Sequence, residues 1–183
     1  MSATRMLVLG VVKLVGEAHG YQVRRELTSW AADKWANVQP GSIYHALKSL
    51  AREGLLEPVG TESDGGPART SYRITPEGDR ELMESLGGAL ADSSRPLDEL
   101  SAGVALLMLM PREQALVLLK SRLVGLTAQV APTRHLVGVF PEMGKPAHVS
   151  ELARLWLVQL EGQVRWTEEL IGRLEAGEYD LRD

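Results

Sequence analysis

The chain of 183 residues contains no cysteine. This absence excludes disulfide bonds, a thiolate nucleophile, and zinc or iron–sulfur sites built on cysteine. Long apolar runs are also absent: the longest, residues 104–110, is far shorter than the roughly eighteen residues that a membrane-spanning helix needs. The sequence shows no signal-peptide pattern. We therefore expect a cytoplasmic protein that does not enter a membrane.

The sequence lacks the residue spacings of common catalytic and metal sites as well. It has no His-x-x-x-His or Glu-x-x-His pair, no glycine-rich phosphate-binding loop and no Gly-x-Ser-x-Gly turn. The four histidines are spread along the chain, and a metal site formed by His135 and His148 with acidic neighbours is the alternative that remains open. We expect no enzyme activity, no metal and no cofactor.

Acidic residues outnumber basic residues, with 24 Asp and Glu against 20 Lys and Arg. The excess lies in the second part of the chain, because residues 1–80 carry a net charge of +1 and residues 81–183 a net charge of −5. An acidic chain is not typical of a nonspecific nucleic-acid binder, so any DNA affinity must come from locally placed cations. The length allows one or two domains.

The most informative stretch runs from Pro40 to Thr75 and predicts a helix followed by a β-hairpin. Pro40 suits the first turn of a helix, and Gly54 suits the residue after its end. Apolar residues at helical spacing predict its buried side: Ile43, Leu47 and Leu50. The opposite side is rich in hydrogen-bond donors: Ser42, His45, Lys48, Ser49 and Arg52.

Two strand-like runs follow this helix, at residues 55–61 and 70–75, and a Gly-Gly-Pro loop joins them. Pro58 argues for an edge strand because it cannot donate to a β-ladder. Arg69 and Arg73 lie in or beside the second run. A donor-rich helix followed by a two-stranded wing has the dimensions to enter the major groove of DNA and reach the neighbouring backbone or minor groove. The stretch therefore predicts a winged helix.

Other helices are predicted on both sides of this stretch. Residues 6–15 are almost wholly apolar and predict a first, buried helix, and residues 21–30 predict a second. Arg24 and Arg25 lie on the solvent side of the second helix, where phosphate contact and a simple solvated face are both open. A further helix is predicted from Pro76 to residue 86, with Thr75 as its N-cap.

Three linked motifs occur in order within residues 5–85. They are Gly20-Tyr21, Ser42-Ile43-Tyr44-x-x-Leu47-x-x-Leu50-x-x-x-Gly54-Leu55, and Gly66-Pro67-x-Arg69-x-x-Tyr72-x-Ile74-Thr75-x-x-Gly78. Together they resemble the PadR family of bacterial transcriptional regulators. The resemblance implies a mainly α fold with a small β wing, in which an N-terminal winged helix-turn-helix precedes a C-terminal helical dimerisation domain. His45 departs from the family pattern, in which proline often follows the tyrosine, so no base preference is carried over.

We expect the DNA contacts to lie on the second helix, the recognition helix and the wing. The candidate residues are Tyr21, Arg24, Ser42, Tyr44, His45, Lys48, Ser49, Arg52, Arg69, Thr70 and Arg73. The outward polar side of the recognition helix would face base edges, whereas Tyr44 and Arg52 would approach the backbone. Arg69 would enter a narrow minor groove or pair with a phosphate, the alternative being a free surface cation.

The domain boundary is predicted after the wing. Gly87-Gly88 and residues 92–96 are linker-like, and the charge shift falls nearby, so we divide the chain into domains at 1–88 and 96–183.

The second domain is helical in pattern throughout. Residues 97–110 predict one apolar helix, and a second begins at residue 111. Pro132 should end or kink that second helix. Residues 141–146 contain two prolines and a glycine and predict a loop.

The last helix, from about His148 to Ala176, carries a stripe at alternating spacings of four and three. The stripe consists of Leu152, Trp156, Gln159, Gln163, Trp166 and Leu170. A second apolar stripe lies beside it, so the helix must pack against more than one partner, and a second subunit would supply one. Alternatively, Trp156 and Trp166 would line a cavity for a flat aromatic effector.

These observations lead to one main hypothesis and one alternative. The main hypothesis is a sequence-specific DNA-binding transcriptional regulator, by the family resemblance a repressor released by a small molecule or other signal. Its partners would be double-stranded DNA with an inverted-repeat operator, a second copy of the chain and a small aromatic effector. The alternative is a winged-helix protein-interaction module that does not bind DNA specifically.

Overall fold

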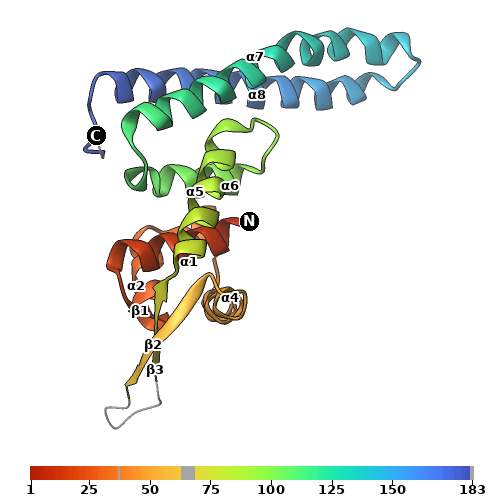
Figure 1. The fold of residues 1–183 in the computed structure, drawn as a ribbon. Coiled ribbons are helices and arrows are strands. Elements are labelled where there is room, and N and C mark those ends of the chain that lie inside the picture. The colour runs from red at the N-terminus through yellow and green to blue at the C-terminus, as the bar shows by residue number, and fades with distance from the viewer. Residues whose placement is uncertain (37, 63–68, 182–183) are drawn as a thin grey trace. The chain divides into compact units, whose positions relative to one another are not determined.

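The computed structural model describes residues 1–36, 38–62 and 69–181, with residues 61, 62 and 69 described as backbone only (Figure 1). Contacts between residues divide the chain into two units. The first contains Met1–Ala89 and Arg95–Met110, and the second contains Leu90–Ser94 and Pro111–Asp183. Residues 97–110 thus group by contact with the N-terminal residues, and each unit is described by itself.

The first unit is a helical domain with a small antiparallel sheet. Its elements are α1 (Ala3–Val15), β1 (Ala18–His19), α2 (Gly20–Ser29), α3 (Ala32–Trp35), α4 (Pro40–Arg52), β2 (Leu56–Glu62), β3 (Arg69–Ile74), most of α5 (Pro76–Ala91), α6 (Leu97–Ala105) and the 3-10 turn η1 (Leu107–Leu109). The predicted first helix, second helix, recognition helix and hairpin are all present. The mainly helical fold class and the winged-helix plan are confirmed.

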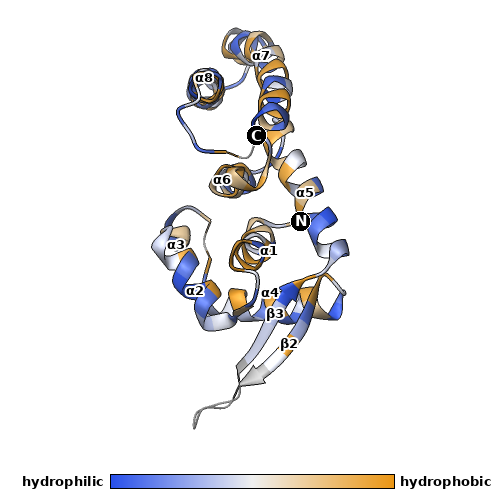
Figure 2. Ribbon diagram, turned by 60° about the vertical axis from the view of Figure 1, so that its left-hand side comes forward, coloured by the Kyte–Doolittle hydropathy of each residue, from blue (hydrophilic) through white to orange (hydrophobic). Residues whose placement is uncertain are grey.

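The core of this unit forms around α1. Residues Met6–Val12 are all buried, and Figure 2 shows α1 coloured as hydrophobic along most of its length. The predicted inner side of α4, Ile43, Leu47 and Leu50, is buried as well, together with Ala46. Fully burying a side chain of this kind stabilises the fold by about 1.5–3 kcal/mol. Packing against α1 therefore fixes which side of α4 remains outside.

The three strands pair in the order β1-β3-β2. The edge position predicted from Pro58 is confirmed, because β2 pairs with β3 alone and its register shifts between Pro58 and Gly60. No sequence pattern predicted β1. This strand has two residues, and it exists because Ala18 and His19 pair with residues of β3 far along the chain.

Two further expectations for this region were wrong. Gly87 and Gly88, expected in a linker, lie inside α5, and residues 97–110 do not form one helix. The helix breaks at Leu106, whose side chain is fully buried and occupies the space beside Gly10 of α1. Tertiary packing overrides helix propensity at such a position.

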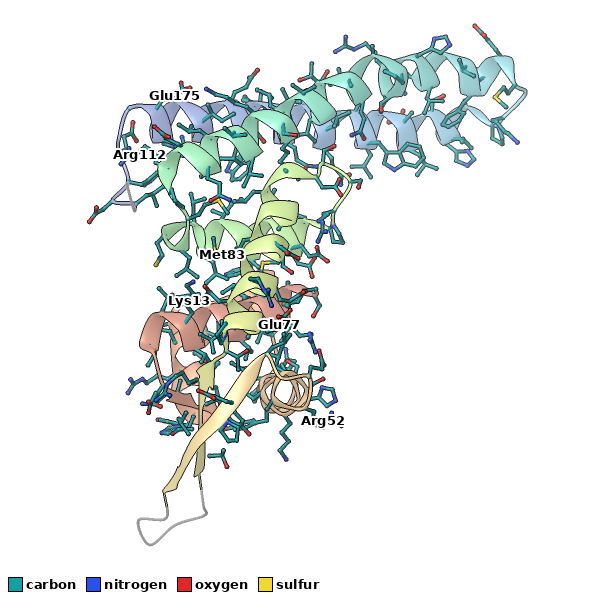
Figure 3. The ribbon with its side chains drawn as sticks, in the orientation of Figure 1. Lys13, Arg52, Glu77, Met83, Arg112 and Glu175 are labelled. Atoms are coloured by element: carbon teal, nitrogen blue, oxygen red, sulfur yellow. The ribbon has the colours of Figure 1, made fainter. Side chains whose placement is uncertain are left out.

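The second unit pairs two long helices, α7 (Arg112–Glu142) and α8 (Ser150–Glu175), connected through the 3-10 turn η2 (Ala147–Val149) (Figure 1). Figure 3 shows Arg112 beside the end of α8, where its guanidinium donates to the Leu174 carbonyl at 3.0 Å. By length and composition α7 is the one helix within the described ranges that could cross a membrane. It packs against α8.

Pro132 was expected to end or kink this helix; it does not end it, because α7 continues through Pro132 and also through Pro141, where a loop was expected, to Glu142. A proline inside a helix removes one hydrogen bond of the ladder. Packing against a neighbouring helix supplies most helical stability in proteins, and α8 provides that neighbour.

A close backbone contact ties the wing to α5. The Thr75 hydroxyl donates to the Gly54 carbonyl at 2.7 Å and accepts from the Gly78 N–H at 3.0 Å, so Thr75 caps α5 as predicted. The carbonyl oxygen of Leu55 occupies the space where a side chain at Gly78 would begin. Backbone cannot rotate away as a flexible side chain can, so this position requires glycine.

We expect Gly78→Ala to lower the free energy of unfolding by about 1–3 kcal/mol, the usual cost of overpacking a well-packed site. Gly41→Ala is the matched control, because nothing lies within 4 Å of an added methyl group there and α4 already has helical geometry. The control should be neutral or slightly stabilising. Urea unfolding of both variants makes the comparison, and equal stabilities would contradict the proposed close contact.

Candidate nucleic-acid interface

The outer side of α4 carries exposed polar and aromatic side chains. Tyr44, His45, Lys48 and Arg52 are exposed, in contrast to the buried residues that alternate with them. Figure 3 shows Arg52 on the side of α4 that faces away from α1. Since the apolar stripe is held against α1, these side chains are presented to solvent by the same packing that forms the core.

The hydroxyl groups of two candidates are used within the protein. Ser42 donates to the Gln39 carbonyl at 2.7 Å and accepts from the Gln39 N–H at 3.1 Å, which caps the start of α4. Ser49 donates to the Glu53 carboxylate at 2.7 Å and accepts from Arg5 at 3.2 Å. Both residues belong to the predicted DNA-binding surface, but the hydrogen bonds of their hydroxyl groups hold α4 in place.

Arg5 and Glu53 connect α1 to the end of α4. The Arg5 guanidinium donates to both carboxylate oxygens of Glu53, at 2.8 and 2.5 Å. These hydrogen bonds, together with the one from Ser49, lower the pKa of Glu53 to about 2. The same pair raises the pKa of Arg5. This pair could not be predicted from local sequence patterns, because its members are far apart in the chain.

The wing presents different residues on its two faces, since successive side chains of a strand alternate. Thr70 and Tyr72 line a cavity next to α4. Arg73 belongs to the opposite face, where it forms ion pairs with Glu57 at 3.4 Å and with Glu17. The hydrogen bond to Glu17 is the main cause that raises the pKa of Arg73. Arg73 therefore does not lie beside Lys48 in this structure.

The wing tip is not described. Residues 63–68, which include the predicted Gly-Gly-Pro loop, lie outside the described residues, as does the side chain of Arg69. The expected role of Arg69 stays a prediction.

A cavity of about 220 Å³ lies between α2, α4 and β3; we call it the α2–α4–β3 cavity. Its lining residues are His19, Gly20, Tyr21, Tyr44, Leu47, Lys48, Thr70 and Tyr72. Four of the predicted DNA-binding residues thus come together here from three elements. Among the described residues that line it, Lys48 carries a positive charge and none is a carboxylate.

His19, Gly20 and Tyr72 are additions to the predicted set. Tyr72 is separated from Thr70 by one residue of the same strand, so the two-residue period was an available signal. His19 gave no such signal, because its place depends on the pairing of β1 with β3.

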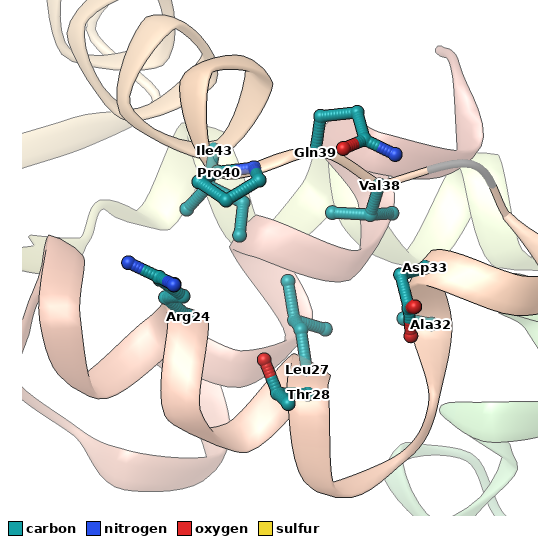
Figure 4. Close-up of a pocket in the computed structure, with 9 residues that line it drawn as sticks. All are labelled: Arg24, Leu27, Thr28, Ala32, Asp33, Val38, Gln39, Pro40 and Ile43. Atoms are coloured by element: carbon teal, nitrogen blue, oxygen red, sulfur yellow. The ribbon is translucent and has the colours of Figure 1, made fainter.

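Arg24 lines a second cavity, also of about 220 Å³, between α2, α3 and the start of α4 (Figure 4). Leu27, Val38 and Ile43 form apolar walls there. Figure 4 shows Arg24 and Asp33 on different sides of this cavity. Arg24 therefore lines this cavity and is not among the residues that line the α2–α4–β3 cavity.

The predicted stripe on α8 is divided between exposed and buried positions. Leu152 and Trp156 are 49% and 46% exposed, and Gln159 is exposed, whereas Leu170 is buried and Gln163 and Trp166 are half-buried. The exposed apolar surface of this helix also includes Leu155 and Val158.

Gln163 is used inside the second unit, where its amide oxygen accepts from Arg122 at 2.7 Å. Arg122 also donates to the Asp92 carbonyl at 2.7 Å and is 1% exposed. Burial lowers the pKa of Arg122, and the nearby Asp92 carboxylate opposes that shift. Gln163 therefore holds α8 to α7 from within the unit.

No group of three histidine, aspartate or glutamate side chains that could hold a metal ion occurs in the part of the chain that the structure describes. His135 and His148 are exposed.

Residues 8–84 match the transcriptional regulator PadR-like family. This match covers α2, α4 and the wing, which form the surface described above, and confirms the resemblance found in the sequence. A family of transcriptional regulators is not a family of enzymes, so the match also agrees with the expected absence of enzyme activity. The comparison with curated proteins finds no match.

The chain also resembles solved structures of other proteins. Bacillus subtilis PadR in complex with operator DNA is 20% identical, with 93% of this chain and 98% of that chain covered and a TM-score of 0.41. The protein smu.1604c from Streptococcus mutans UA159 is 18% identical, with 94% and 99% covered and a TM-score of 0.42. Bacillus subtilis PadR in complex with p-coumaric acid is 17% identical, with 94% and 99% covered and a TM-score of 0.38.

The ion pair at the end of α4 leads to a pH-dependent prediction. Because the pKa of Glu53 is about 2 in the folded chain and ordinarily 4.5, the pair stabilises the fold above about pH 4.5 and loses its effect as the pH falls through about 2. Glu53→Gln should therefore lower the melting temperature near pH 6 and make much less difference near pH 2.

The expected difference is small and decreases with salt, because the Glu53 side chain is 46% exposed. Glu84→Gln, at an exposed carboxylate of the same unit, is the control and should show no comparable pH dependence. A Glu53→Gln effect that persists undiminished at pH 2 would contradict the assigned pair.

Proposed function

Because residues 8–84 match the PadR-like family of transcriptional regulators, we propose that this chain binds a specific operator in double-stranded DNA. The observation that carries the proposal is the exposed side of α4, which stands beside the α2–α4–β3 cavity with its lysine and hydroxyl groups. An α-helix of this kind fits the major groove, and a neighbouring wing reaches the backbone.

Roles within the surface follow from what each side chain already contacts. His45, Lys48 and Arg52 are exposed and would turn towards base edges or phosphates. Ser42 and Ser49 would have to give up internal hydrogen bonds, so we assign them to positioning α4. Tyr21, Tyr44 and Thr70 would contact the backbone from the cavity.

We further propose that the protein acts as a homodimer through α8. Leu152, Leu155, Trp156 and Val158 leave an apolar surface in solvent, and a second copy of the chain would cover it. Two recognition helices related by twofold symmetry would then read an inverted repeat with half-sites about one helical turn apart. The domain at 1–88 would bind DNA, and the domain at 96–183 would form the dimer.

As a regulator it would act as a repressor in the cytoplasm, released by a small aromatic effector. Trp156 and Trp166 would receive a flat ring, and binding would change the geometry of the dimer rather than the DNA surface itself. Coupling between two such sites is typically about 1–3 kcal/mol, and it is reciprocal.

The alternative is a winged helix that contacts another protein instead of DNA. Lys48, surrounded by hydroxyl groups and with no carboxylate among the described lining residues, favours a phosphate-rich partner over an apolar one.

DNA binding is tested on the region upstream of the protein's own gene. We expect a preference for that region over random duplex at physiological salt, and His45→Ala should weaken it by about tenfold if His45 reads a base edge. The affinity should fall steeply as salt rises. Equal affinity for both duplexes at matched salt would exclude specific regulation.

Dimerisation is tested by a charge on the exposed surface of α8. Leu152→Glu should shift the protein towards the monomer in analytical ultracentrifugation, because the interface would have to bury an unpaired charge. Met143→Glu, at a position that is 62% exposed and outside the predicted stripe, should leave the dimer intact. Two variants with the same oligomeric state would refute the assigned interface.

The effector is tested first with p-coumaric acid, a flat aromatic acid. Binding should change tryptophan fluorescence and weaken operator binding, and Trp156→Phe should reduce the affinity for the acid while the dimer survives. If a panel of aromatic acids changes neither signal, both tryptophans belong to helix packing.

A further inference from the structure

We propose that the α2–α4–β3 cavity seats one phosphate group of the DNA backbone, and that His19 and Tyr72 donate to it together with the predicted residues. This inference rests on the proposed function, since it names the chemical group of DNA that the cavity would hold. It adds two residues to the interface and gives the cavity a single occupant.

The first argument is the chemistry of the lining. A phosphate group offers several acceptor oxygens and a negative charge, and it is best held by a cation together with several neutral donors. Lys48 is the charged group in the described lining, and no carboxylate opposes it there. The hydroxyl donors come from all three elements: Tyr21, Tyr44, Thr70 and Tyr72.

Second, the hydrogen bonds that cap α2 determine which ring nitrogen of His19 carries the proton. The ring Nδ1 of His19 accepts the backbone N–H of Gln22 at 3.3 Å, while the backbone N–H of His19 donates to the Gln22 side-chain oxygen at 3.0 Å, and the two bonds cap α2. A nitrogen that accepts a hydrogen bond carries no proton, so the proton of the neutral ring lies on Nε2. The cap therefore leaves His19, which is one of the residues that line the cavity, with an Nε2–H donor on its ring.

The third argument is the close approach of Tyr44 to the start of α2. A side chain at Gly20 would overlap the ring of Tyr44, so glycine lets the phenol lie directly against the first residue of that helix. The N-terminus of α2 has a partial positive charge, which favours an anion near this point. The volume of about 220 Å³ accommodates a phosphate and several water molecules, which occupy about 30 Å³ each.

The experiment uses the full-length protein and the tightest-binding short duplex selected from a random pool. Each backbone phosphate is replaced in turn by a neutral methylphosphonate. If the cavity holds one phosphate, we expect one position in each half-site at which the methylphosphonate weakens DNA binding by roughly tenfold. This is the usual loss of a charge-assisted contact. Lys48→Met should cause a similar loss on the unmodified duplex and little further loss on the duplex modified at that position.

Two conservative variants test the added donors. Tyr72→Phe keeps the ring and removes the hydroxyl, and it should weaken binding by roughly fivefold. His19→Asn keeps a good N-cap for α2 and removes the ring donor, so DNA binding should weaken while thermal stability is retained. Both losses should shrink on the duplex that lacks the seated phosphate.

The controls remove similar groups elsewhere. Lys34→Met deletes an exposed cation of the same unit, and Tyr179→Phe deletes a phenol of the other unit. Neither variant should lose affinity at the selected phosphate position.

The outcomes distinguish a failure of the proposed phosphate site from a failure of the proposed function. We call the phosphate site in this cavity the seat. If selection yields no duplex that binds above random DNA, the proposed function fails, and the seat fails with it. If the duplex binds but the methylphosphonate losses are spread evenly, or add fully to that of Lys48→Met, the seat alone is overturned. Saturable binding of inorganic phosphate that Lys48→Met abolishes, without any methylphosphonate effect on DNA, would assign the cavity to a free anion and also overturn the seat.

Discussion

The contact between the Leu55 carbonyl and Gly78 is the constraint on which the surface that we propose for DNA binding depends. Leu55 follows the turn at Gly54, where φ is +76°, and its N–H donates back to the Leu50 carbonyl of α4 at 2.9 Å. Its carbonyl accepts from the Thr75 N–H at 3.1 Å. The end of α4, both wing strands and the start of α5 thus meet around one residue. Side chains on α4 and β3 can form one surface because this junction fixes them relative to each other.

The acidic composition is compatible with DNA binding because the charges are not equivalent. Arg73 is already paired with Glu17 and Glu57, and Arg5 with Glu53, so these cations add little to the local potential. Lys48 lies among neutral donors instead. The electrostatic field of a protein is focused where charges of one sign lie together in a concave site, whatever the sign of the net charge. The position of a cation is therefore more informative here than the net charge of −4.

The parts of the fold that the sequence predicted are those set by local signals. Pro40 marks the start of α4, Thr75 the cap of α5, and Pro58 an edge strand, each through its own backbone chemistry. The wrong predictions concern positions where packing against residues far away in the sequence determines the secondary structure. The helix that begins at Leu97 ends before Leu106, whose side chain packs beside Gly10. The helix α7 continues through Pro132 because it packs against α8. For the candidate site, the exposed side of α4 was predictable from helical periodicity, whereas the cavity required a strand pairing that no local pattern encodes.

The stripe on α8 shows how one periodic pattern can contain two kinds of surface. Towards the end of the helix it faces inward, since Leu170 is buried and Gln163 accepts a hydrogen bond from the buried guanidinium of Arg122. Such a guanidinium is costly without polar partners, so Gln163 is not available to a ligand or a second chain without a loss of stability in its own unit. The residues left for an external partner therefore lie in the first half of α8, from Leu152 to Val158. An interface centred there would place the half-buried Trp166 at its edge and Trp156 at its centre.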